Sequence, residues 1–166
     1  MILGLSIPTF TLLHVIISLI GIASGLIVLF GMFGSHRLPG WTALFLLTTV
    51  LTSATGFLFP ATTLTPGAIF GIISLVVLLA ALIALYVFHL GGAWRWIYVG
   101  GAVIALYLNI FVLIVQSFQK IPFLHPLAPT GSEPPFLAAE GALLVIFVAL
   151  GIAALLKFHP ERHAAP

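Results

Sequence analysis

The chain has 166 residues, of which 62% are hydrophobic and 5% are charged, and its mean hydropathy is +1.34. A soluble domain carries about a quarter charged residues, so this composition excludes a water-soluble globular protein. The net charge of +2 comes from scattered basic residues and the chain has no cysteine, which argues against nucleic-acid partners and excludes thiol redox chemistry and cysteine-ligated metals.

Five apolar segments meet or approach the length of about 20 residues that a helix needs to cross a bilayer. Proline and glycine lie where the segments should end, and the runs lack the strict alternation of barrel strands. The sequence therefore predicts an all-α membrane protein, a single bundle of five transmembrane helices in residues 1–158, followed by a short cytoplasmic tail at 159–166. The predicted spans are 10–33, 41–59, 67–90, 96–118 and 136–158. The first lacks a basic n-region and is predicted to be a retained helix.

The orientation follows from the basic residues, which concentrate on the cytoplasmic side of membrane proteins. With five spans, Arg37, Arg95, Lys157 and Arg162 fall on one side and Lys120 on the other. This distribution predicts an external N-terminus and a cytoplasmic C-terminus. It also predicts an aromatic belt on the cytoplasmic side, formed by Trp94, Trp96 and Tyr98.

Glu140 is the only carboxylate inside a long apolar run. An ionisable group at membrane depth costs roughly 2.5–3.5 kcal/mol on insertion scales, so it needs a partner, water or a function. The topology brings Glu140 to the outer third of the membrane together with His14, Gln116 and Lys120. One interpretation is an outward-facing site in which Glu140 titrates. The alternative is structural: Glu140 reaches the headgroups or pairs with Lys120 or His14.

Several smaller residues predict helix packing. Ser18, Gly21 and Gly25 share one face of the first helix with His14, and Gly21 to Gly25 matches the small-xxx-small contact pattern. Asn109 lies near mid-membrane on the face of the fourth helix that also carries Gln116 and Lys120. It predicts either a helix–helix hydrogen bond or the lining of a wet path. The second helix is rich in hydroxyls, and those of Thr48, Thr52 and Thr55 share one face. They could coordinate a polar substrate, but we interpret them as structural because such groups usually bond backbone carbonyls. The full set is Thr42, Thr48, Thr49, Thr52, Ser53 and Thr55.

No catalytic motif is present and we predict no catalytic residues, metal or cofactor. A haem is the alternative, because bis-histidine ligation needs two imidazoles at one depth. His36 and His89 form the only pair that the predicted topology places on the same side and within the bundle.

Two pairs of segments carry a resemblance. One joins Arg37-Leu-Pro-Gly-Trp-Thr-Ala-Leu-Phe with Thr55-Gly-Phe-Leu-Phe-Pro60. The other joins Gly92-Ala-Trp-Arg-Trp-Ile-Tyr98 with Leu127-Ala-Pro-Thr-Gly-Ser-Glu-Pro-Pro-Phe136. Together they resemble a group of small bacterial inner-membrane proteins described only as hypothetical. The resemblance implies a multi-pass protein of the bacterial cytoplasmic membrane, and it implies no functional residues.

Three functional hypotheses follow. The first is a non-enzymatic accessory or self-associating subunit, whose partners would be the lipid bilayer and either copies of itself or a larger membrane complex. The second is a small proton-linked transporter or sensor with an outward-facing site around Glu140. The third is a haem-binding electron-transfer protein that uses His36 and His89.

Overall fold

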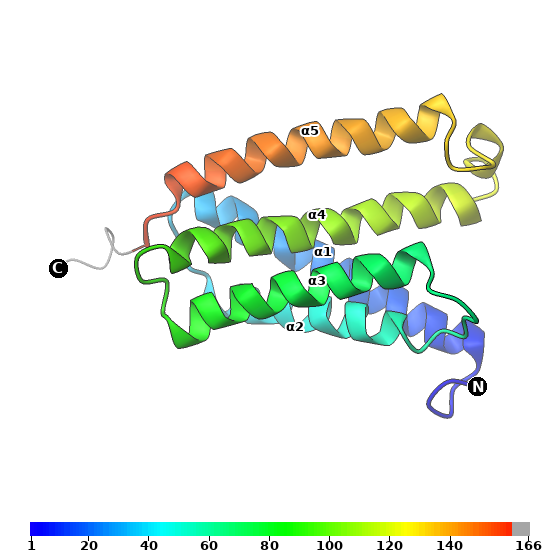
Figure 1. The fold of residues 1–166 in the computed structure, drawn as a ribbon, viewed down its shortest axis with the longest axis horizontal. Helices are drawn as coiled ribbons and strands as arrows, with labels where there is room; N and C mark the ends of the chain where they lie inside the picture. The colour runs from blue at the N-terminus through cyan, green and yellow to red at the C-terminus, as the bar shows by residue number, and fades with distance from the viewer. Residues whose placement is uncertain (161–166) are drawn as a thin grey trace.

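The computed structural model describes residues 1–160, and these residues form five α-helices and no β-strand. Consecutive helices run antiparallel along the long axis of the molecule, so α1, α3 and α5 share one direction (Figure 1). Their bounds are α1 Ile7–Phe33, α2 Pro39–Gly56, α3 Pro66–Leu82, α4 Trp94–Lys120 and α5 Pro134–Lys157. The predicted tail falls mostly outside the described residues.

Each helix begins one to three residues before the predicted span. In α1, α2, α3 and α5 a proline lies in the first turn, and polar side chains cap α1 and α3. Ser6 caps α1 by accepting a hydrogen bond from the amide of Thr9 at 3.3 Å. Thr65 caps α3 by accepting one from the amide of Ala68 at 3.1 Å. Proline suits a first helical turn because it has no amide hydrogen to satisfy. The Pro39-Gly40 pair, predicted to be a turn, is therefore the first turn of α2.

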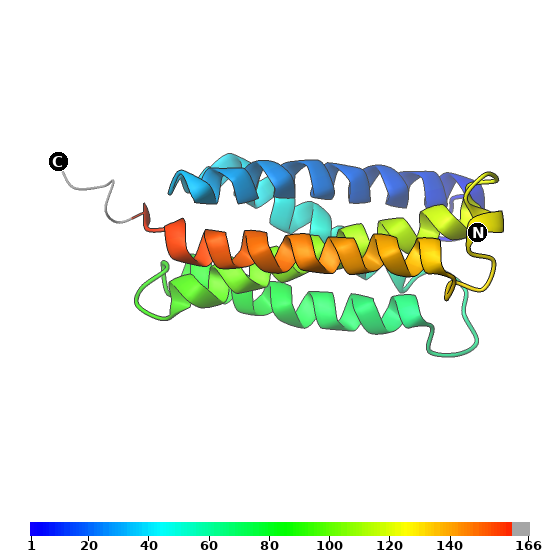
Figure 2. The ribbon, with the colours of Figure 1, turned by 90° about the horizontal axis from the view of Figure 1, so that it is seen from above.

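Helix α4 is the centre of the bundle. It packs against α1, α2, α3 and α5, and it is the most buried of the long apolar helices. Figure 2 shows α1 and α3 flanking α4 and α5 on opposite sides. Tight contacts near mid-bundle involve Gly25 of α1, where an added Cβ would lie 2.7 Å from Leu106 Cδ1 and 2.8 Å from the ring of Phe45. Gly25 therefore lets α1 approach both α2 and α4 closely.

The third helix ends before residue 90, where the predicted span ended. A π-helical turn, Ile83–Val87, extends α3, and Trp94 then stacks on Phe88 with ring centroids 4.0 Å apart. Tyr98 is only 2% exposed and packs near Phe158. The predicted aromatic belt is thus wrong for Tyr98, because the helical turn that exposes Trp96 directs Tyr98 to the core.

The C-terminal end of α5 is held by two other parts of the chain. The hydroxyl of Ser35, in the α1–α2 link, donates to the carbonyl of Lys157 at 2.5 Å. The guanidinium of Arg95 donates to the carbonyls of Leu155 and Phe158 at 3.3 and 2.6 Å. These bonds satisfy carbonyls that a helix end leaves without intrahelical partners. They also place Arg95 and Lys157 at the same end of the bundle as the C-terminal end of α1.

Among the described residues, four helices are long and apolar enough to cross a membrane: α1, α3 extended to Val87, α4 and α5. Large apolar side chains cover their outer faces, for example Val76 of α3 at 63% exposed and Val145 of α5 at 70%. Such surfaces suit a multi-helix membrane protein, since lipid can cover them. Helix α2, with 18 residues and several hydroxyls, is not one of the four, and its membrane crossing stays a prediction.

Candidate functional site

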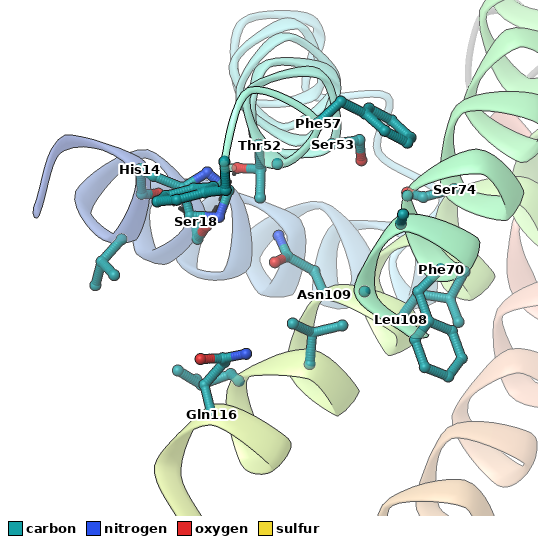
Figure 3. Close-up of a pocket in the computed structure, with 18 of the residues that line it drawn as sticks. His14, Ser18, Thr52, Ser53, Phe57, Phe70, Ser74, Leu108, Asn109 and Gln116 are labelled. Atoms are coloured by element: carbon teal, nitrogen blue, oxygen red, sulfur yellow. Dashed lines mark hydrogen bonds between the residues drawn. The ribbon is translucent and has the colours of Figure 1, made fainter. Parts of the chain in front are cut away.

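A cavity of about 340 Å³ lies between α1, α2, α3 and the C-terminal half of α4. Its lining residues come from the half of the bundle that carries the N-terminus and the α2–α3 link, and Figure 3 shows most of them as sticks. Its apolar wall includes three phenylalanine rings and aliphatic side chains from α1 and α4: Val15, Leu19, Phe57, Phe59, Phe70, Leu108, Val112 and Leu113. Its polar wall includes hydroxyl, imidazole, amide and ammonium groups: Thr11, His14, Ser18, Thr49, Thr52, Ser53, Thr65, Ser74, Asn109, Gln116 and Lys120.

His14 is fixed on the cavity wall by α2. Its Nδ1 lies 2.8 Å from Oγ1 of Thr55, while that Oγ1 lies 2.7 Å from the carbonyl oxygen of Leu51. Two oxygens this close need a proton between them, so the Thr55 hydroxyl donates to Leu51 and accepts from His14. The ring nitrogen Nδ1 therefore carries hydrogen. In the neutral ring this leaves Nε2 as an acceptor, and Nε2 has no protein partner within residues 1–160.

Two hydroxyl groups on the wall differ from every other serine or threonine hydroxyl in the five helices of residues 1–160. The other serines and threonines of the five helices each make at least one hydrogen bond, mostly to the carbonyl four residues earlier. Ser53 of α2 and Ser74 of α3 are 9% and 6% exposed, yet neither hydroxyl has a partner in residues 1–160. Both line the cavity, and Figure 3 shows them on the same side of it. Neither hydroxyl oxygen is itself fully buried, so both open onto the cavity, where they can bond water or a ligand.

The floor of the cavity lies near mid-bundle. Asn109 of α4 points toward α1 and α2 (Figure 3), and its Nδ2 is buried without a hydrogen-bond partner in the described part of the chain. A Cβ added at Gly21 would lie 3.3 Å from that Nδ2 and 3.2 Å from Oγ1 of Thr48, so Gly21 makes room for this polar layer. The contact of Gly25 with Phe45 and Leu106 follows one turn further along α1. The cavity is therefore closed at this apolar layer.

At the rim, Gln116 and Lys120 project from the last turns of α4. Among residues 1–160, Lys120 is the only charged side chain that lines the cavity, and no carboxylate of this range lines it. The first turn of α3 also borders the rim, through Thr65, Gly67 and Ala68. The electrostatic character of the cavity is therefore positive.

The structure brings three of the four predicted site residues to this cavity. His14, Gln116 and Lys120 line it, and Glu140 does not. Glu140 is 8% exposed on α5, which packs on α4 and α1, and both of its carboxylate oxygens are buried without a hydrogen-bond partner among residues 1–160. Of the predicted packing residues, Gly21 and Gly25 face α2 and α4. Ser18 bonds the carbonyl of His14 at 2.9 Å and lines the cavity with Asn109.

Sequence reasoning interpreted Ser53 as structural with the other hydroxyls of α2, and it missed Ser74 and the phenylalanine rings of the wall. Ser74 is the only hydroxyl in the middle of the very apolar α3, and that isolation was a usable signal. Ser53 was hidden among the many hydroxyls of α2. Only the packing of α2, α3 and α4 against one another shows that the two serines line one cavity.

Within residues 1–160 no group of three or more His, Asp or Glu side chains could hold a metal ion. His36 lies in the α1–α2 link, and His89 follows the π-helical turn with a φ of +48°. Neither lines the cavity, and a haem between them stays a prediction. Comparison with protein-family models, with curated proteins and with solved structures finds no match for this chain. Function is therefore inferred from the cavity and its residues.

Proposed function

We propose that this protein is a membrane-embedded binding protein that holds a small amphipathic molecule in the cavity between α1, α2, α3 and α4. One observation carries the proposal: the side chains of Ser53 and Ser74 present two hydroxyls, neither with a hydrogen-bond partner among residues 1–160, to a cavity of about 340 Å³. Ligand sites commonly enclose about 300–1,000 Å³ and combine apolar walls with a few polar groups. This cavity has both properties.

The proposal develops the transporter or sensor hypothesis and moves its centre from Glu140 to His14, Ser53 and Ser74. The apolar layer at Gly25, Phe45 and Leu106 supports binding at one end in preference to an open channel. Transport would require this layer to separate. The hypothesis of an accessory or self-associating subunit stays a prediction, and a sensor that binds a ligand is compatible with it.

Native mass spectrometry of the protein, extracted from membranes in a mild detergent, tests the proposal. We expect a bound small molecule that survives gentle ionisation and is lost in Ser74→Phe, which fills the cavity. Val76→Phe adds the same ring two residues away on the exposed face of α3 and should keep the molecule. The milder Ser53→Ala/Ser74→Ala variant preserves the volume and should reduce occupancy. A bound molecule that survives in Ser74→Phe, or no bound molecule in any preparation, would refute the proposal.

We also propose that all five helices cross the membrane, with the N-terminus outside and the C-terminus in the cytoplasm. Helix α2 runs parallel to the long axis of the bundle like the other helices (Figure 1). The basic residues support the orientation, since Arg37, Arg95 and Lys157 lie at one end and Lys120 at the other. The location in a bacterial inner membrane rests on the sequence resemblance alone.

Single-cysteine labelling tests this topology directly because the chain has no cysteine of its own. Thr62→Cys and Ala93→Cys place exposed thiols in the α2–α3 and α3–α4 links. A membrane-impermeant maleimide added to intact cells should label Thr62→Cys and spare Ala93→Cys until the cells are opened. The opposite labelling pattern would show that the N-terminus is cytoplasmic. Labelling of both from outside would show that the links lie on one side.

A further inference from the structure

The charge on the cavity wall distinguishes between classes of ligand. Within residues 1–160, Lys120 is the only charged lining side chain, and no acidic residue of this range forms an ion pair with it. Neither Glu133 nor Glu140 lines the cavity. A cationic ligand would therefore meet a like charge and no counter-charge, whereas an anion would meet an ammonium group at the rim.

The N-terminal end of α3 adds to this positive character. Thr65, Gly67 and Ala68 place the first turn of α3 at the rim, and the aligned peptide dipoles leave partial positive charge at a helix N-terminus. Hydroxyl donors lie deeper, on Ser53 and Ser74, which are both more than nine-tenths buried and lack protein partners. The path from the rim to the interior thus offers an ammonium group, then hydroxyls, without an opposing carboxylate.

The remaining wall is apolar and aromatic. Phe57 and Phe59 follow the end of α2, and Phe70 lies one turn into α3, opposite Leu108 and Val112 of α4. Phe59 also meets the His14 ring edge to face, with centroids 5.3 Å apart. These surfaces favour a flat or branched hydrocarbon body, because removing it from water contributes about 25 cal/mol per Å².

We propose that the ligand is an organic anion, with its anionic group beside Lys120 and its apolar body between the phenylalanine rings and α4. This inference rests on the proposed function and adds the charge of the ligand. The same chemistry could belong to a soluble carboxylate or to the head of an anionic lipid. Lys120 is an anchoring residue in both cases, since a hydrogen bond from an ammonium group to an anion is stronger than one between neutral partners.

Three probes of similar size and different charge test the inference. Benzoate, benzyl alcohol and benzylammonium are titrated at neutral pH into the full chain in nanodiscs of phosphatidylcholine, and binding is measured by ligand-observed NMR. We expect benzoate to bind about tenfold more tightly than benzyl alcohol, and benzylammonium to bind most weakly. Lys120→Gln should abolish the preference, so that benzoate and benzyl alcohol bind with equal affinity. Lys157→Gln, at the opposite end of the bundle, serves as the matched control and should behave as wild type.

The outcomes separate the two proposals. If benzoate and benzyl alcohol bind equally, or if the preference survives in Lys120→Gln, the cavity binds ligands but the inference about charge is wrong. If none of the three probes binds, the inference is also wrong, and native mass spectrometry still decides the proposed function. The mass of the co-purifying molecule distinguishes the sources: an anionic phospholipid or a small carboxylate would each support the inference, and a cation would refute it.

Discussion

The imidazole Nδ1 of His14 lies 2.8 Å from Oγ1 of Thr55, and this contact joins α1 to α2 beside the cavity. Because the Thr55 hydroxyl is committed to the carbonyl of Leu51, the contact orients the ring and fixes which nitrogen carries hydrogen. Ser18 reinforces the arrangement, since its hydroxyl lies 2.9 Å from the His14 carbonyl and 3.4 Å from Oγ1 of Thr52. The imidazole is therefore a pre-oriented part of the wall.

The first prediction concerns this tautomer. In protein labelled with nitrogen-15 at histidine, the Nδ1 of His14 should show the chemical shift of a protonated ring nitrogen and Nε2 that of an unprotonated one. Thr55→Val removes the acceptor, so the ring should no longer prefer hydrogen on Nδ1. Thr11→Val, on the same wall but not bonded to the ring, should keep that preference. A wild-type spectrum with hydrogen on Nε2 alone would contradict the proposed hydrogen-bond directions.

The second prediction concerns the closed end of the cavity. Gly25→Ala places a methyl group 2.7 Å from Leu106 Cδ1 and 2.8 Å from the Phe45 ring, both in fully buried side chains. Overpacking of this kind costs about 1–3 kcal/mol, so the unfolding midpoint in detergent should fall. Gly100→Ala on α4 is the control, because its added Cβ meets nothing within 4 Å. Equal midpoints for the two variants would show that the helices at Gly25 can separate at little cost.

The third prediction concerns Glu140. Its two carboxylate oxygens are buried and have no hydrogen-bond partner within residues 1–160. Because an unsatisfied buried polar group costs about 1–3 kcal/mol, Glu140→Leu should raise the unfolding midpoint. Leu137→Ala, on the exposed face of α5, should change it little. A lower midpoint in Glu140→Leu would indicate that the carboxyl group has a stabilising partner, such as water or a second subunit.

The fourth prediction concerns Glu133 in the loop before α5. Hydrogen bonds from the Thr130 hydroxyl at 2.7 Å and from the amides of Thr130 and Ser132 at 3.1 Å lower the pKa of Glu133 from 4.5 to about 2. A lowered folded-state pKa means that the carboxylate stabilises this turn fully above about pH 4.5 and loses that effect as the pH falls toward 2. Amide hydrogen exchange at Thr130, corrected for its intrinsic pH dependence, should therefore lose protection over this range.

The matched control for that experiment is a variant in which residue 133 cannot carry a charge. Glu133→Gln should leave the corrected protection at Thr130 low and independent of pH, since the amide cannot ionise. Glu140→Gln lies outside this turn and should keep the wild-type profile. If Thr130 keeps its protection down to pH 2 in the wild type, the loop is held by contacts other than the carboxylate.

Part of the candidate site followed from the sequence and part did not. The depth of His14, Gln116 and Lys120 along their helices was predictable, because the rise of a helix fixes depth once its ends are known. The rotation of α5 was not predictable, because Glu140 sits in an apolar run that gives no preferred face. In the folded protein the carboxylate of Glu140 does not line the cavity.

The sequence by itself determined the class of protein and the positions of its helices. Apolar runs of bilayer length, interrupted by proline and glycine, can satisfy their backbone in lipid only as helices. Only the tertiary structure decided which helices are neighbours, and with them the cavity. Ser53 and Ser74 lie on different helices, and no sequence pattern within either helix predicts that the two side chains line one cavity. Their common cavity depends on packing around α4, where small residues such as Gly21 and Gly25 set how closely the helices approach.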